Sequence, residues 1–331
     1  MGQAPGRPAT GGAAVRSDVL RGPLEVVVNI TNACNQHCPF CFNDSGHSRE
    51  GELTDEELLG LADQLRTLKP FNVCFSGGEP LLRSAVLLEC ARVLSSVGIR
   101  ISLATNGTLV TRSLARRLID SGMREVQMSL DAGRADIHDG MRRSRGAFEK
   151  VVGAFATFRD LGFRDVSASF TLMDNNYMEI ENAVDLLSGL DVPVLTLRPL
   201  LLAGRAEQSM VPSPVVGRAV ARLIAGLRTS ATTMVQCPDP LSQLFILRSG
   251  ASMRHMEVAA NGALIPSPYL RAVLGSVRRH RLVEYWDAGW SHALEHPLLR
   301  DLLDSFTGNQ DLPAMGLRVE AANEHGLDLL A

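Results

Sequence analysis

The sequence predicts an α/β fold built on a parallel sheet, followed by a smaller module. From about Leu24, short β-rich runs alternate with amphipathic helical stretches six times. Strands joined by helices are parallel, because each helix returns the chain to the edge where the previous strand began. After about Ala206 this rhythm stops, and the remaining sequence is long enough for a module of its own.

The predicted elements follow from local signals. Thr54 and Glu57 form a capping box before a run of periodic leucines, and Gly98, Gly122 and Gly162 each follow a helical stretch where a left-handed residue is expected. A further helix is predicted near 215–227. The predicted strands span 24–30, 72–76, 100–105, 125–130, 166–172 and 192–200. The predicted segments are a disordered leader (1–22), the βα array (23–208), a connecting helix and loop (209–245) and the final module (246–331).

Composition narrows the function classes. A net charge of −3 and a pI near 6.3 argue against a nucleic-acid-binding scaffold. No uninterrupted apolar stretch approaches the ~20 residues that cross a bilayer, and the first residues lack the apolar core of a signal peptide. Six cysteines without an export signal fit a reduced cytoplasm and metal chemistry better than disulfides. We therefore expect a cytoplasmic protein that binds neither nucleic acid nor membrane.

Three of the cysteines stand together in "CNQHCPFC", directly after the first predicted strand. Cys34, Cys38 and Cys41 are one ligand short of the four that structural zinc and most protein-bound clusters use. A Cys3His zinc knot would need His37, which lies between two of the thiols with too little backbone to turn. Three thiolates can instead hold three irons of a 4Fe–4S cube and leave the fourth iron open for chemistry.

The spacing C-x3-C-x2-C, with Phe40 before the last cysteine, resembles the radical S-adenosylmethionine (SAM) superfamily, and the resemblance implies that Phe40 contacts SAM. The resemblance spans Leu24 to about Ala206 and implies a partial (β/α)6 TIM-like barrel. In that family SAM itself is the missing ligand of the open iron. "FSGGEP", after the second strand, resembles the segment that receives the amino group of SAM, and this implies contacts from Gly77, Gly78, Glu79 and Pro80.

The resemblance implies further SAM contacts at later strand ends. "ATNGT" supplies Thr105 and Asn106, and "MSLD" supplies Ser129 and Asp131, which match the family's polar contacts to the ribose and methionine parts. Arg142 matches a candidate partner for the SAM carboxylate, although a plain surface arginine near a helix is an open alternative. "RPLLLAGRA", with Arg205, resembles the segment that flanks adenine.

The resemblance also implies a mechanism and partners. A reduced 4Fe–4S cluster passes one electron to the sulfonium of SAM, which splits to methionine and a 5′-deoxyadenosyl radical. The radical abstracts hydrogen from an unactivated C–H bond of the substrate, while the protein orients the target carbon. The expected electron donor is of the flavodoxin or ferredoxin type.

The segment 249–286 resembles the start of a SPASM or twitch module, with a turn at Asn261-Gly262. Ser249 and Ser267 stand where that module carries cysteine ligands. Because iron–sulfur clusters select soft thiolates, we expect a degenerate module without an auxiliary cluster. Without an auxiliary cluster, a net redox-neutral outcome such as decarboxylation, epimerisation or rearrangement is favoured.

The other three cysteines carry weaker signals. Cys74 and Cys90 lie in apolar stretches and are expected to be buried, inert thiols. Cys237 lies in a loop between the array and the final module, where it is a candidate hydrogen donor to a substrate radical; a structural thiol is the alternative.

The substrate is the least determined feature. A natural-product precursor of sugar, nucleoside or aminoglycoside type is favoured, and a ribosomal peptide, epimerised or cross-linked, is the alternative. A zinc-stabilised binding module and an electron carrier are rivals outside this class, but a carrier would ligate every iron with cysteine.

Overall fold

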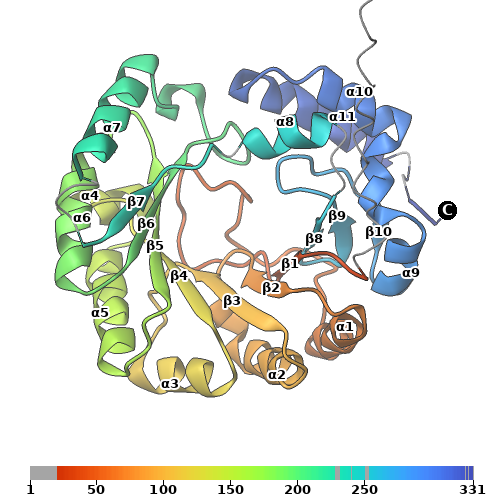
Figure 1. The fold of residues 1–331 in the computed structure, drawn as a ribbon, viewed down its shortest axis with the longest axis horizontal. Coiled ribbons are helices and arrows are strands. Elements are labelled where there is room, and N and C mark those ends of the chain that lie inside the picture. The colour runs from red at the N-terminus through yellow and green to blue at the C-terminus, as the bar shows by residue number, and fades with distance from the viewer. Residues whose placement is uncertain are drawn as a thin grey trace, which may run out of the picture.

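The computed structural model describes residues 21–330 except 228–231, 240, 250–252, 325 and 327. One mixed sheet organises the described chain, in the strand order β10-β9-β8-β1-β2-β3-β4-β5-β6-β7. Figure 1 shows this sheet curled around a centre, with the helices on its outer side. The predicted partial barrel of parallel strands is thus confirmed. The predicted leader falls almost wholly outside the described residues.

The six predicted strands form within two residues of their expected limits, and β7 and β8 add parallel neighbours at the two sides of the array. The strands are β1 (Glu25–Asn29), β2 (Asn72–Ser76), β3 (Arg100–Thr105), β4 (Glu125–Ser129), β5 (Val166–Leu172), β6 (Val194–Pro199), β7 (Met234–Gln236), β8 (His255–Val258), β9 (Ala263–Ile265) and β10 (Gly275–Ser276).

The helices begin and end where the sequence signals placed them. The Thr54 hydroxyl accepts a hydrogen bond from the Glu57 amide at 3.2 Å, and the Glu57 carboxylate accepts one from the Thr54 amide at 2.8 Å. The α-helices are α1 (Asp55–Leu68), α2 (Ser84–Ser95), α3 (Arg112–Asp120), α4 (Ala135–Arg142), α5 (Ala147–Asp160), α6 (Ile180–Gly189), α7 (Pro214–Leu227), α8 (Ser242–Arg248), α9 (Leu282–Asp287), α10 (Pro297–Asp304) and α11 (Leu312–Glu324). Gly98, Gly122 and Gly162 all have positive φ, as predicted.

The segment after the array is attached more closely than the sequence predicted. β8 pairs in parallel with β1, with Glu25 opposite His255, so the expected separate module instead extends the barrel sheet. β9 and β10 then continue antiparallel, and the predicted turn at Asn261-Gly262 joins β8 to β9 with Gly262 at φ +84°. A sequence pattern of only four strand residues was too short to show this pairing.

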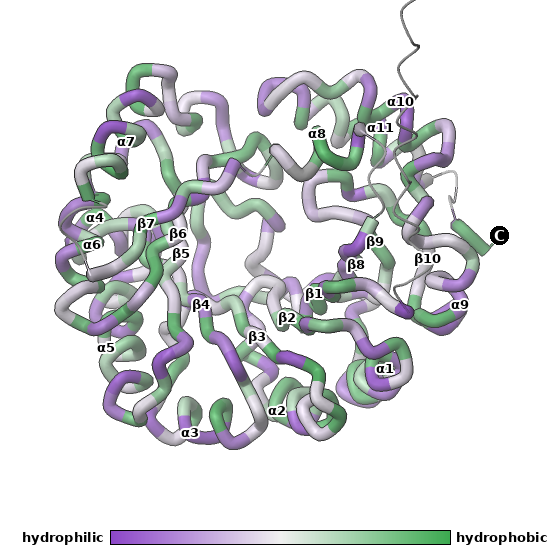
Figure 2. Tube along the Cα trace, in the orientation of Figure 1, coloured by the Kyte–Doolittle hydropathy of each residue, from purple (hydrophilic) through white to green (hydrophobic). Residues whose placement is uncertain are grey.

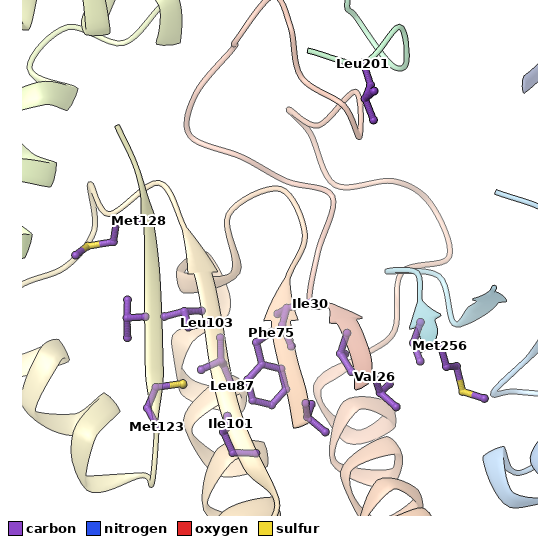
Figure 3. Close-up of a cluster of buried hydrophobic side chains, with 14 of the residues drawn as sticks. Val26, Ile30, Phe75, Leu87, Ile101, Leu103, Met123, Met128, Leu201 and Met256 are labelled. Carbon is purple, nitrogen blue, oxygen red and sulfur yellow. The ribbon is translucent and has the colours of Figure 1, made fainter. Parts of the chain in front are cut away.

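The hydrophobic core fills the space between the outer face of the sheet and the helices. Figure 3 shows Val26, Phe75 and Ile101 on three neighbouring strands, with Leu87 of α2 packed against them. Each of these side chains is at most 1% exposed. Alternate residues face the other way, so hydrophobic and hydrophilic positions alternate along the strands (Figure 2). The inner face is therefore left largely to polar side chains.

Among the described residues, one stretch is long and apolar enough by length and composition to cross a membrane, Gln208–Leu227. It contains α7, which carries Arg218 and Arg222 and buries Val216 and Val220. Only 11% of its window is buried, and a single stretch of this kind is weak evidence for a membrane span.

Candidate active site

The cysteine loop follows β1 and closes on itself. The amide of Cys34 donates to the Gly46 carbonyl at 2.9 Å, and the amide of Gly46 donates to the Asn32 carbonyl at 3.1 Å. A shorter turn joins the Cys41 amide to the Cys38 carbonyl at 3.2 Å. These bonds fix the backbone on both sides of the three thiols.

All three thiols line one cavity of about 370 Å³, which lies beyond the carboxyl ends of β2 to β6. Cys38 is 8% exposed, and Cys34 and Cys41 are half-buried. No three His, Cys, Asp or Glu side chains of the described residues gather closely enough to hold a single metal ion. The donors are thus soft thiols spread around a space, which fits a cluster better than one zinc ion.

Burial sets the acidity of these thiols. It raises the pKa of Cys34 to about 11 and also raises that of Cys38. Both are therefore protonated at neutral pH in the free protein, and binding of metal must release their protons. The nearby Arg142 guanidinium partly offsets the effect of burial on Cys38.

The two glycines of "FSGGEP" serve the packing of two loops. A Cβ on Gly78 would lie 2.2 Å from the Ala33 carbonyl oxygen, and one on Gly77 would lie 2.4 Å from that of Thr31. The Gly78 amide donates to Thr31 at 2.8 Å. Both glycines line the cavity, as predicted, but the close approach that requires them is to the cysteine loop.

Glu79 does not line the cavity, which differs from the direct SAM contact predicted for it. Its side chain is fully buried and accepts hydrogen bonds from the Thr105 hydroxyl at 2.7 Å, the Asn106 amide at 2.8 Å and the Leu81 amide at 3.0 Å. Burial raises its pKa, and these three donors oppose the change. Glu79 thereby joins the ends of β2 and β3; Pro80 begins the following turn, also outside the cavity lining.

Asn106 connects the end of β3 to the cysteine loop. Its side-chain amide donates to Asn35 Oδ1 at 2.8 Å and lies 4.0 Å from Cys34 Sγ. Asn35 in turn donates to the Thr108 hydroxyl at 2.9 Å. Thr105, Asn106, Ser129 and Phe40 all line the cavity, where the sequence analysis predicted SAM contacts.

Asp131 lies behind the cavity wall, where it holds Arg142. Arg142 donates from Nε and Nη2 to one Asp131 oxygen at 2.6 and 2.5 Å, and the other oxygen accepts from the Thr171 amide at 2.7 Å. Arg142 Nη1 lies 3.9 Å from Cys38 Sγ, and the guanidinium lies 5.6 Å from the Phe40 ring. Arg142 is only 9% exposed, so the alternative of a plain surface arginine is wrong.

Arg205 binds the cysteine loop itself and does not line the cavity. Its Nε donates to the Cys38 carbonyl at 3.0 Å, and Nη1 donates to the Ser45 carbonyl at 2.7 Å and pairs with Asp44 at 2.9 Å. Next to it, a Cβ on Gly204 would lie 2.2 Å from the Cys41 carbonyl oxygen. The segment after β6 therefore supports the loop from outside.

A second, larger cavity of about 700 Å³ adjoins the first. Phe42 and Tyr269 line both cavities, with their rings in an edge-to-face contact at 6.1 Å. The larger cavity lies between the cysteine loop, the β8–β9 hairpin and α11. Sequence reasoning missed Tyr269, although it stands two residues after Ser267.

The remaining cysteines and the two serines have distinct surroundings. Cys90 is buried between α2 and α1, as predicted. Cys74 faces the inner side of the sheet beside Ser102, which corrects the expected apolar surroundings; burial still raises its pKa to about 12. Cys237 is exposed and lines neither cavity, so the structure does not bring it to the thiols.

Comparison with known proteins agrees with this geometry. Residues 28–187 match the family model of the radical SAM superfamily. Solved radical SAM enzymes share the fold, including Streptococcus suis SuiB bound to its precursor peptide SuiA, with a TM-score of 0.66, 16% identity and coverage of 86% of this chain and 67% of that one. The chain therefore contains a radical SAM domain over residues 28–187 and is an enzyme of that class.

Several relatives have assigned functions. The chain is 25% identical to the AdoMet-dependent heme synthase of Methanosarcina barkeri, over 81% of this chain and 83% of that protein. It is 29% identical to mycofactocin maturase MftC of Mycolicibacterium smegmatis, but spans only 46% of that protein's length. It is 24% identical to the PqqA peptide cyclase of Bradyrhizobium diazoefficiens, over 80% of this chain and 73% of that protein. A radical SAM domain implies a 4Fe–4S cluster and SAM.

Proposed function

We propose that Cys34, Cys38 and Cys41 hold one 4Fe–4S cluster, and that SAM binds beside it in the smaller cavity. The observation that carries this proposal is the convergence of three soft donors, and no carboxylate, on one cavity of about 370 Å³. When bound, the cluster supplies the electron that cleaves SAM. Cavities of roughly 300–1,000 Å³ hold one ligand of drug-like size, so the smaller cavity suits SAM with the end of the substrate that reacts beside it, and the adjoining larger cavity is left for the rest of the substrate.

The chain's own residues position these ligands. Asn106 and Arg142 approach the sulfurs of Cys34 and Cys38 with donor groups, which stabilise thiolate charge. Arg205 and the Gly77-Gly78 turn hold the loop from two sides. Phe40 and Leu200 pack in a small apolar cluster around Cys38, which limits the access of water to the reacting atoms.

We propose a natural-product precursor as the substrate and a net redox-neutral reaction, because Ser249 and Ser267 provide no thiolate for an auxiliary cluster. The names of the relatives lend no support to the sugar- or nucleoside-type molecule that the sequence favoured. Peptide modification is the second candidate function, favoured by the larger cavity of about 700 Å³ and by the name of one relative, the PqqA peptide cyclase. A flavodoxin- or ferredoxin-type donor and a cytoplasmic location complete the proposal.

The test is anaerobic reconstitution of the full chain with iron and sulfide, followed by reduction with dithionite in the presence of SAM. We expect a brown protein that forms 5′-deoxyadenosine and methionine. A colourless protein that binds zinc and leaves SAM intact would contradict the proposal. Deuterium transfer from candidate precursors into 5′-deoxyadenosine would then identify the substrate.

A further inference from the structure

The charged groups of the smaller cavity are unevenly balanced. Two arginines, Arg142 and Arg198, line it, and none of the described residues lining it is Asp, Glu or Lys. Arg142 is neutralised by Asp131 and nearly buried. Arg198 is exposed to the cavity and has no ion pair within 4 Å among the described residues. The cavity therefore contains one guanidinium that no carboxylate of the described residues pairs with at contact distance.

Arg198 is held in place by neutral groups on neighbouring strands. From β6, its Nε donates to Ser169 Oγ of β5 at 3.1 Å, and its Nη2 donates to Gln127 Oε1 of β4 at 3.1 Å. Because all three residues belong to strands of one sheet, the position of the guanidinium is fixed by rigid elements. Nη1 makes no hydrogen bond among the described residues, so part of the planar fork remains available to a ligand.

The nearby carboxylates already have other partners. Glu25 lies 3.4 Å from His255, and Glu125 pairs with Arg100 at 3.0 Å. Glu257 accepts from the Asn29 side-chain amide at 2.6 Å. None of these three glutamates lines either cavity. Arg198 therefore has no carboxylate of the described residues within 4 Å; its charge acts on Glu25 only at longer range, as the last and smallest of the contributions that lower the pKa of Glu25 after those of His255 and Asn72. A guanidinium is a strong bidentate partner for a carboxylate that comes closer.

We infer that Arg198 binds a carboxylate of the substrate, with Gln127 and Ser169 as the residues that orient its guanidinium. The inference rests on the proposed function and adds that the substrate is a carboxylic acid. An anchor on the β4–β6 wall would hold the target carbon at a fixed place across the cavity from the cysteine loop. Neither Gln127 nor Ser169 stood out in the sequence, because both are ordinary inward-facing strand residues.

The test uses the reconstituted full chain with SAM and matched probe pairs, namely acetate, succinate and hippurate, each with its neutral amide. Dissociation constants would be measured by saturation-transfer NMR. We expect at least one carboxylate to bind wild type about tenfold more tightly than its amide, as for a hydrogen bond to a charged group. Arg198→Gln should lose this preference, Arg198→Lys should keep part of it, and Arg164→Gln, an exposed control, should keep all of it.

Three results would overturn the inference. The first is a wild type that prefers no carboxylate of the panel over its amide. The second is a preference that survives in Arg198→Gln. The third is a large loss of SAM affinity in Arg198→Gln, measured by equilibrium dialysis, which would assign the guanidinium to the SAM carboxylate. Iron content and 5′-deoxyadenosine formation, measured on the same wild-type sample, report separately whether the proposed function itself fails.

Discussion

The cysteine loop and the segment from Ser249 to Ser267 are the two places where the sequence pointed to iron–sulfur ligands, and they differ in structure. The three thiols line one cavity, and hydrogen bonds fix the backbone around them. Ser249 is exposed at the end of α8, where its hydroxyl donates to the Ile246 carbonyl at 2.7 Å, while Ser267 is buried and lines neither cavity. Binding an iron–sulfur cluster therefore requires side chains that line the same cavity as well as side chains of the right chemical type.

The largest expected effect comes from removing a thiol of the loop. Cys34→Ala, Cys38→Ala or Cys41→Ala should abolish both cluster assembly and 5′-deoxyadenosine formation, because no other described soft donor lines the cavity. Iron analysis and the SAM cleavage assay measure this directly. Cys90→Ala is the matched control: it should retain full iron content at a modest packing cost. SAM cleavage by the Cys38→Ala protein would refute the ligand assignment.

The next effect concerns the buried ion pair beside the loop. Asp131→Asn leaves the nearly buried Arg142 without its counter-charge, which should lower the free energy of unfolding by about 3–5 kcal/mol. Urea denaturation measures this loss. Arg134→Gln, which breaks an exposed pair with Asp136, should cost less than about 1 kcal/mol. Equal decreases in the free energy of unfolding of the two variants would show that the buried ion pair contributes no more to stability than the exposed one.

A smaller effect is expected where the two loops meet. Gly78→Ala places a Cβ against the Ala33 carbonyl, and overpacking of this kind costs about 1–3 kcal/mol. Because the displaced backbone carries Cys34, cluster content should fall as well. Gly60→Ala is the control inside α1, where a Cβ meets nothing within 4 Å; it should stabilise the protein by up to about 1 kcal/mol. Full iron content in Gly78→Ala would contradict the proposed support of the loop.

The smallest effect tests how the final segment is attached. Hydrogen bonds from Arg278 and the Thr54 amide lower the pKa of Glu57 to about 2. A lowered folded pKa contributes stability above the ordinary value of 4.5, and this stability is lost as pH falls toward 2. Glu57→Gln should therefore be less stable than wild type at pH 7, by less than about 1 kcal/mol for so exposed a pair, and the difference should shrink below pH 4.5.

Urea unfolding at pH 7 and at lower pH measures this difference, with Glu56→Gln as the control from the same helical turn. A difference between Glu57→Gln and wild type that stays constant with pH would show that the Arg278 contact does not act through the charge of Glu57.

The features that the sequence predicted correctly are those that depend on residues close together in the chain. The capping box of Thr54 and Glu57 and the left-handed glycines after α2, α3 and α5 depend on a few neighbouring residues, and all formed as expected. The cysteine loop was found because its spacing is local and its position after β1 follows from the βα rhythm.

The rest depended on contacts between distant segments. Nothing near His255 shows that it pairs with Glu25, and nothing near Gly78 shows that Ala33 lies against it. Glu79 looked like a ligand contact, but its three hydrogen bonds to the chain become visible only when the ends of β2 and β3 meet. Arg198 was hidden for a related reason, since the sequence does not show that the described residues place two neutral side chains, and no carboxylate, within contact of its guanidinium.

The most direct test of the account is the number of irons and sulfides per chain in the reconstituted wild type and in the Cys34/Cys38/Cys41 triple alanine variant. A single cube on the cysteine loop predicts about four irons in wild type and essentially none in the triple variant. About seven to eight irons in wild type, with a residual cluster signal in the triple variant, would contradict it, because a second cluster would then have found ligands elsewhere in the chain.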